Sequence, residues 1–103
     1  MELPAVGVDI EAVQRFATMP DRLFTDAELA HAGSRLDSRA GIWCAKEAVV
    51  KAVSKWRQLS LRQVEITYDG DRPSARVEGF EIDVSISHTV DHAVAFAIAV
   101  PRT

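Results

Sequence analysis

The fold is decided by the stretch Trp43-Cys44-Ala45-Lys46-Glu47-Ala48-Val49-Val50-Lys51-Ala52. We predict that it is the centre of a helix from Ser38 to Lys55, because this span has no proline and its only glycine lies near its start. Glu47 and Lys51 are four residues apart, so they lie on one face, one turn from each other. Apolar residues at steps of three and four form a stripe that a core would cover: Ile42, Ala45, Val49, Ala52, Val53 and Trp56.

The composition indicates a single domain over residues 1–103. The chain is 48% hydrophobic and 26% charged with a formal net charge of −3, which is ordinary for a soluble protein and argues against general nucleic-acid binding. No stretch is long and apolar enough for a membrane helix, and the N-terminus lacks the layout of a signal peptide. The lone cysteine, Cys44, is assigned to packing and suits a reducing compartment. We therefore expect a cytoplasmic protein without membrane attachment.

The net charge conceals a basic segment. From Cys44 to Arg62 the only acid is Glu47, among the basic residues Lys46, Lys51, Lys55, Arg57 and Arg62. Lys46 and Lys51 flank Glu47 and could hold a phosphate-bearing ligand from both sides. Taken alone, such lysines more often form a solvated helix face, and Glu47 with Lys51 is then a surface ion pair worth a few tenths of a kcal/mol.

Capping signals precede the central helix. Thr25 followed by Glu28 matches the Ser/Thr-x-x-Glu capping box, which predicts a helix from Asp26 to about Ala32. Asp37 or Ser38 is then expected to cap the central helix.

Strand signals lie towards the two ends of the chain. Alternation from Ala5 to Val13 predicts a first strand, and a short helix is expected within Glu11 to Thr18. After Trp56 the spacing of the apolar residues changes from the helical period to the alternation typical of strands. This predicts four strands in an antiparallel meander: Val64–Tyr68, Ala75–Val77, Ile82–Ser87 and Ala93–Val100. This order predicts an α+β fold, in which an antiparallel sheet carries the long central helix on one face.

Two acidic residues lie on the first predicted strand. Asp9 and Glu11 are two residues apart, so both carboxylates face the same way. With Glu47 they offer an all-oxygen site, which suits Mg²⁺ better than zinc. Alternatively, Asp9 caps a backbone turn at the strand end, and the spacing is compatible with both roles.

Another polar group, Ser87-His88-Thr89, ends a later strand and places His88 at the strand exit. A lone histidine is more often structural than catalytic, and the absence of a Gly-x-Ser-x-Gly elbow argues against a serine hydrolase. His31 and His92 have no companion motif and receive no role.

Taken together, three stretches resemble the 4′-phosphopantetheinyl transferase superfamily, and most closely its short branch, the holo-acyl-carrier-protein synthases. That family has Gly-x-Asp near the N-terminus, Lys-Glu-Ala-x-x-Lys on a long helix and Ser-x-Ser-His-Thr on a strand near the end. Here, in the same order, these are Gly7-Val8-Asp9, Lys46-Glu47-Ala48-Val49-Val50-Lys51 and Ser85-Ile86-Ser87-His88-Thr89. The resemblance covers nearly the whole chain.

The resemblance implies that the phosphopantetheine arm of coenzyme A moves to a serine of an acyl carrier protein, with release of adenosine 3′,5′-bisphosphate. By position, Asp9 and Glu47 would hold Mg²⁺ against the pyrophosphate of coenzyme A. Glu47 or a metal-bound water would take the serine proton, and Lys51 would stabilise charge on the leaving phosphate. Arg15 matches the arginine with which the short enzymes grip the carrier protein. The coenzyme A-binding group would consist of Lys46, Lys51, Arg72, Ser87, His88 and Thr89.

Some positions depart from the short branch. Glu11 stands where the larger, two-lobed branch has a third metal ligand. Ile42 stands where the short branch usually carries an arginine, and Asp71-Arg72-Pro73 stands where Gly-Lys-Pro is usual, with Arg72 retaining the charge.

The resemblance also implies an assembly. The two-lobed enzymes build their site between two copies of this unit, and the short enzymes form trimers with sites at subunit contacts. We therefore expect a homotrimer in which Asp9, Glu47 and Lys51 come from one subunit and Ser87 and His88 from its neighbour.

Two other interpretations are weighed against the transferase. One is a non-catalytic carrier-docking or oligomerisation domain with the same fold. Ile42 and Asp71 favour it, because at these two positions the chain departs from the pattern of the short enzymes. The other is an unrelated coenzyme A- or nucleotide-binding protein, which would use the basic helix but would not need the pair Asp9 and Glu11. Dependence on magnesium separates the transferase from both.

Overall fold

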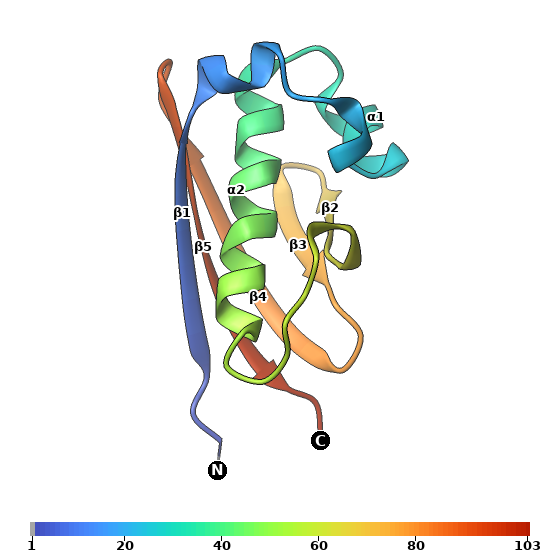
Figure 1. Cartoon of the computed structure of the whole chain (residues 1–103), viewed down its shortest axis with the longest axis vertical. Helices are drawn as coiled ribbons and strands as arrows, with labels where there is room; N and C mark the ends of the chain where they lie inside the picture. The colour runs from blue at the N-terminus through green and yellow to red at the C-terminus, as the bar shows by residue number, and fades with distance from the viewer. Residues whose placement is uncertain (1) are drawn as a thin grey trace.

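The long helix α2 (Leu36–Val53) lies against one face of a three-stranded antiparallel sheet (Figure 1). This arrangement is that of a computed structural model, which describes residues 2–103. The sheet has the order β1 (Ala5–Ala12), β5 (His92–Pro101), β4 (Phe80–His88), so the first strand pairs with the last. The predicted α+β fold with a long helix on one sheet face is confirmed. No helix among residues 2–103 combines the length and hydropathy needed to cross a membrane.

Helix α2 begins and ends slightly earlier than predicted. Its N-cap is Arg35, whose side chain makes no capping hydrogen bond. The prediction that Asp37 or Ser38 caps the helix is wrong, because Asp37 already lies in the first turn. There its Oδ1 accepts the backbone N–H of Ser38 at 2.8 Å, and its Oδ2 pairs with Arg35 at 3.0 Å. A carboxylate in the first turn is favoured by the helix dipole.

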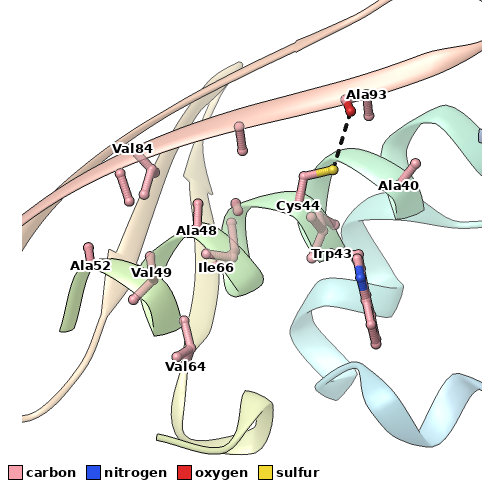
Figure 2. Packing of buried hydrophobic residues seen from close by; sticks show 14 of the residues in the cluster. Ala40, Trp43, Cys44, Ala48, Val49, Ala52, Val64, Ile66, Val84 and Ala93 are labelled. Carbon is pink, nitrogen blue, oxygen red and sulfur yellow. Dashed lines mark hydrogen bonds between the residues drawn. The ribbon is translucent and has the colours of Figure 1, made fainter. Parts of the chain in front are cut away.

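Small residues let α2 approach the sheet closely. The residues of β5 that face the helix are buried alanines: Ala93, Ala95, Ala97 and Ala99. On β1, a Cβ added at Gly7 would lie 2.0 Å from the carbonyl oxygen of Ala48, so only glycine fits there. The Cys44 thiol donates to the Ala93 carbonyl at 3.4 Å (Figure 2), and burial raises the pKa of Cys44 to about 12. Cys44 therefore has the packing role predicted for it.

A second, two-stranded sheet packs beside α2 and next to β4 (Figure 1). In it β2 (Glu65–Asp69) pairs with β3 (Arg72–Arg76), and the buried residues Val64 and Ile66 join the core around α2 (Figure 2). The predicted four-stranded meander is therefore wrong at one step. Among the described strands, β3 pairs only with β2, because this hairpin packs beside α2 instead of extending the main sheet.

Short helical elements complete the fold. The capping box predicted at Thr25 and Glu28 is confirmed: Thr25 Oγ1 accepts the backbone N–H of Glu28 at 3.2 Å, and Glu28 Oε1 accepts that of Thr25 at 2.8 Å. The short helix expected after the first strand is a tighter 3₁₀ turn. The elements are η1 (Val13–Ala17), η2 (Asp21–Leu23), α1 (Asp26–Ala32) and η3 (Leu61–Gln63).

The face of the main sheet away from α2 is apolar and exposed. Val6, Val8 and Ile10 of β1 are 58%, 55% and 64% exposed, and Phe96 and Ile98 of β5 are 47% and 38% exposed. The register places Val8 opposite Phe96 and Val6 opposite Ile98, so these side chains form one patch. We call these five residues the outer apolar face.

Candidate active site

Asp9 of β1 and Lys51 of α2 meet where the helix packs on the strand. Asp9 points towards α2, because alternate residues of β1 do, and its side chain is 11% exposed. Lys51 Nζ donates to Asp9 Oδ1 at 3.2 Å and to the Val8 carbonyl at 2.8 Å. Asp9 Oδ2 is buried and has no hydrogen-bond partner among residues 2–103. Since buried carboxylate oxygens usually have a partner, this atom is suited to a ligand from outside the chain.

Glu47 is coupled to this pair through its charge. It lies one turn before Lys51 on α2 and is half-buried. Burial raises the pKa of Glu47 and the charge of Asp9 raises it further, whereas Lys51 lowers it. Burial also raises the pKa of Asp9, against the hydrogen bond from Lys51, which lowers it. The charged forms of both carboxylates are therefore disfavoured, and a nearby cation would stabilise them.

Glu11 faces the same side of β1 as Asp9, as predicted, but its carboxylate is already paired. Arg15 Nη1 donates to Glu11 Oε1 at 2.6 Å. The guanidinium of Arg15 also lies 5.4 Å from the ring centre of Trp43, a cation–π contact that helps to hold it.

Within residues 2–103, no three His, Cys, Asp or Glu side chains are arranged to hold a metal ion. The three predicted carboxylates are therefore not a preformed three-ligand cluster, and because Arg15 already pairs with Glu11, Asp9 and Glu47 are the pair considered for the metal. This pair still fits Mg²⁺, which proteins commonly bind through one or two carboxylates together with substrate phosphates. The unpartnered Asp9 Oδ2 supplies one such ligand.

Lys46 does not take part in the site. Its side chain is 0% exposed, and its Nζ donates to Glu28 Oε1 at 2.8 Å inside the core. The same carboxylate accepts the backbone N–H of Ile66 at 2.8 Å through Oε2. The prediction that Lys46 contacts a phosphate is contradicted by this placement, because an enclosed ammonium that is already paired cannot reach a ligand.

A second group of polar residues lies at the end of β4. His88 lines a cavity of about 290 Å³, and its Nδ1 lies 3.9 Å from Oδ2 of Asp37. His31 and Tyr68 also line this cavity, and their rings stack with centres 3.7 Å apart. Sequence reasoning missed His31, Asp37 and Tyr68 as cavity residues. They come from α1, α2 and β2, and no local pattern connects them.

Three further residues of the predicted coenzyme A-binding group lie on β4, in the turn after it, or on β3. Ser87 is exposed and points to the opposite side of β4 from His88. Thr89 Oγ1 accepts the backbone N–H groups of Asp91 at 3.3 Å and His92 at 3.1 Å, which orders the turn after β4. Arg72 lines an adjoining cavity of about 470 Å³.

The two groups of residues lie at opposite edges of the main sheet. The register aligns Asp9 with Ile86 across β5, and β1 and β4 are therefore separated by two strand spacings, roughly 10 Å. Helix α2 packs between them: Gly41 lies against Ile86 of β4, and Ala48 lies against Gly7 of β1. One chain therefore does not bring Asp9 and His88 together.

The fold and these residues define a class of protein. The family model of the 4′-phosphopantetheinyl transferase superfamily matches residues 5–101, and the chain belongs to that superfamily.

Relatives and solved structures agree with this assignment. The holo-[acyl-carrier-protein] synthase of Thermodesulfovibrio yellowstonii is 33% identical over an alignment of 110 positions that covers 93% of this chain and 97% of that protein. The acyl carrier protein synthase of Mycobacterium tuberculosis has a TM-score of 0.82 and 34% identity, and the match covers 95% of this chain and 97% of that one. The complex of ACPS with CoA from Chronobacterium ammoniagenes has a TM-score of 0.81 and 27% identity, with 99% and 100% covered.

Proposed function

We propose that this protein transfers the 4′-phosphopantetheine group of coenzyme A to a serine of an acyl carrier protein in the cytoplasm, in a reaction that depends on Mg²⁺ and releases adenosine 3′,5′-bisphosphate. The observation that carries the proposal is the buried, unpartnered Oδ2 of Asp9, beside Glu47 and Lys51, in a chain of this superfamily. A carboxylate pair with a lysine is suited to holding a metal and a diphosphate together.

The residues on the α2 side have distinct roles in this reaction. Mg²⁺ held by Asp9 and Glu47 would neutralise the pyrophosphate oxygens of coenzyme A. Glu47 accepts the proton of the carrier serine as its hydroxyl attacks the phosphorus next to pantetheine, and the bond from that phosphorus to the bridging oxygen breaks. Burial, and then the charge of Asp9, raise the pKa of Glu47 in the protein without metal, which makes its carboxylate a stronger proton acceptor than that of an exposed glutamate. Lys51 stabilises the charge that develops on the leaving phosphate.

The cavity at the end of β4 is the proposed place of the nucleotide. His88 reaches its phosphates, the Asp37 carboxylate lies 3.9 Å from Nδ1 of the imidazole, and Arg72 approaches from the adjoining cavity. Thr89 follows His88 in the turn after β4, and Ser87, on the opposite side of β4, would need a neighbouring subunit to contact the same nucleotide. Arg15, which is half-exposed beside Glu11, is the proposed contact for the carrier protein.

We infer that three copies assemble and complete each site between neighbours. The outer apolar face presents five large apolar side chains in one patch, which a protein rarely leaves in water. A second copy of this chain is the occupant, because the Asp9 and His88 groups lie at opposite edges of one sheet and need a neighbour to meet.

We expect Phe96→Asp to convert the trimer to monomers and to remove transfer activity, because the charge would be buried in the contact between subunits. The side chain is 47% exposed within one chain, so the monomer should fold. Sedimentation velocity measures the assembly, and circular dichroism checks the fold. Gln58→Asp, an exposed loop change, is the matched control. A wild-type protein that sediments as an active monomer would contradict the inference.

The function is tested by incubating the protein with coenzyme A, Mg²⁺ and several apo carrier proteins. We expect a mass gain of one phosphopantetheine on the carrier, which is lost when the metal is chelated. A mass gain that does not require magnesium, or no mass gain on any of the carrier proteins, would contradict the proposal. A stable trimer without any gain would favour the alternative, a non-catalytic docking or oligomerisation domain.

A further inference from the structure

We propose that Trp43 is a positioning residue for the carrier protein, because its ring packs against the guanidinium of Arg15 and fixes the orientation of that proposed carrier contact. This inference rests on the proposed function, since it requires an acyl carrier protein to bind at Arg15. It gives a role to a buried aromatic side chain that the transfer reaction itself does not use.

Trp43 is held firmly by its neighbours. It lies on α2 and is only 7% exposed. Its ring packs edge-on against that of Phe16 on η1, with ring centres 5.9 Å apart, and against that of Phe24, with centres 6.3 Å apart. Within residues 2–103 its buried Nε1 has no hydrogen-bond partner, so the packing of the ring sets its position. Trp43 is therefore a rigid support.

The guanidinium of Arg15 is fixed from two directions. Its Nη1 donates to Glu11 Oε1 at 2.6 Å, and the guanidinium carbon lies 5.4 Å from the centre of the Trp43 ring. The ring centre of Phe16 is 6.0 Å from the same carbon. A carboxylate at one edge and aromatic rings beside the group restrict the rotations that an exposed arginine otherwise has.

The rest of the Arg15 side chain faces solvent. It is 49% exposed, and among residues 2–103 the guanidinium donates only through Nη1. Its other N–H groups are thus presented to a partner in one orientation. A guanidinium that is already fixed loses less conformational entropy when it binds a carboxylate. We therefore expect a carboxylate of the carrier protein to bind Arg15 more tightly than it would bind a freely rotating arginine.

The test is the binding of an apo acyl carrier protein, measured by isothermal titration calorimetry without coenzyme A or Mg²⁺, so that no transfer occurs. Trp43→Leu should weaken binding by about three- to fivefold, the usual effect of losing one cation–π contact at the surface. Trp43→Phe keeps a ring and should weaken binding by less than about twofold. Trp56→Leu removes a similar contact with Lys55 at 5.0 Å, and as the matched control it should leave carrier affinity unchanged.

A double variant shows whether Trp43 acts through Arg15. In the Arg15→Gln background there is no guanidinium to position, so Trp43→Leu should change carrier affinity by less than about 1.5-fold there. A purely structural role of Trp43 would instead weaken binding equally in both backgrounds. Circular dichroism checks that each variant is folded.

The orientation of Arg15 is also measured in the wild-type protein, without any substitution. In its NMR spectrum the Nε–H resonance of Arg15 should be displaced from those of exposed arginines by the ring currents of Trp43 and Phe16.

Four results would overturn the inference. They are unchanged carrier affinity in Trp43→Leu, equal weakening in both backgrounds, an Arg15 resonance at the position of exposed arginines, and a wild type that binds no carrier protein. None of these results decides the proposed function, which is judged separately by the mass gain of the carrier.

Discussion

Glu47→Gln is expected to lower the rate of phosphopantetheine transfer by about 10²- to 10³-fold, because it removes the proposed base and a metal ligand together. Glutamine has nearly the same shape, so the loss will not come from altered packing. The rate is measured as the mass gain of an apo carrier protein with time. Glu81→Gln, an exposed change on β4, is the control and should keep the wild-type rate.

The same variant should be more stable than wild type at neutral pH. The pKa of Glu47 is raised in the folded protein by burial and by the charge of Asp9. The protonated Glu47 side chain therefore makes its full contribution to stability when the pH is below the pKa that this group has in the unfolded chain. The contribution is lost as the pH rises through the higher pKa that Glu47 has in the folded protein. Above that value the charged side chain opposes folding, and glutamine removes this effect.

Denaturant unfolding at neutral pH and near pH 4 measures this difference. The advantage of Glu47→Gln should be present at neutral pH and should shrink in acid, where wild-type Glu47 is protonated. An inactive variant that is also less stable at neutral pH would indicate a structural role for Glu47 and would contradict its assignment to catalysis.

Lys46→Met is expected to lower the free energy of unfolding by about 3–5 kcal/mol, because it removes one partner of the buried ion pair between Lys46 and Glu28. Both side chains are 0% exposed, so the Glu28 carboxylate would be left as a buried charge without its counter-ion. Urea unfolding followed by circular dichroism measures the loss. Lys55→Met removes an exposed ammonium and should cost much less.

A double variant tests the cause of this loss. Because Lys46 and Glu28 are in direct contact, Lys46→Met with Glu28→Gln should be at least about 1 kcal/mol more stable than the sum of the two single losses predicts. It should not recover fully, since Glu28 also accepts the backbone N–H groups of Thr25 and Ile66. Additive losses, or a single loss below about 1 kcal/mol, would show that the pair is not what stabilises this part of the core.

Local sequence determined the elements and their inward faces. The apolar stripe around Trp43 predicted α2, Thr25 and Glu28 predicted the start of α1, and alternation on β1 predicted that Asp9 and Glu11 face the same side. These signals act within about one helical turn or two strand residues, so they can be read directly from a single chain.

Only the tertiary structure decided which charged residues remain available for chemistry. Lys46 and Lys51 both stand beside Glu47 in the helix, yet one pairs with Glu28 in the core and the other with Asp9 at the site. Local patterns do not distinguish them, because their partners lie far away in the sequence and meet them only when α1 and β1 pack on α2. Burial then decides which lysine is structural and which can act on a phosphate.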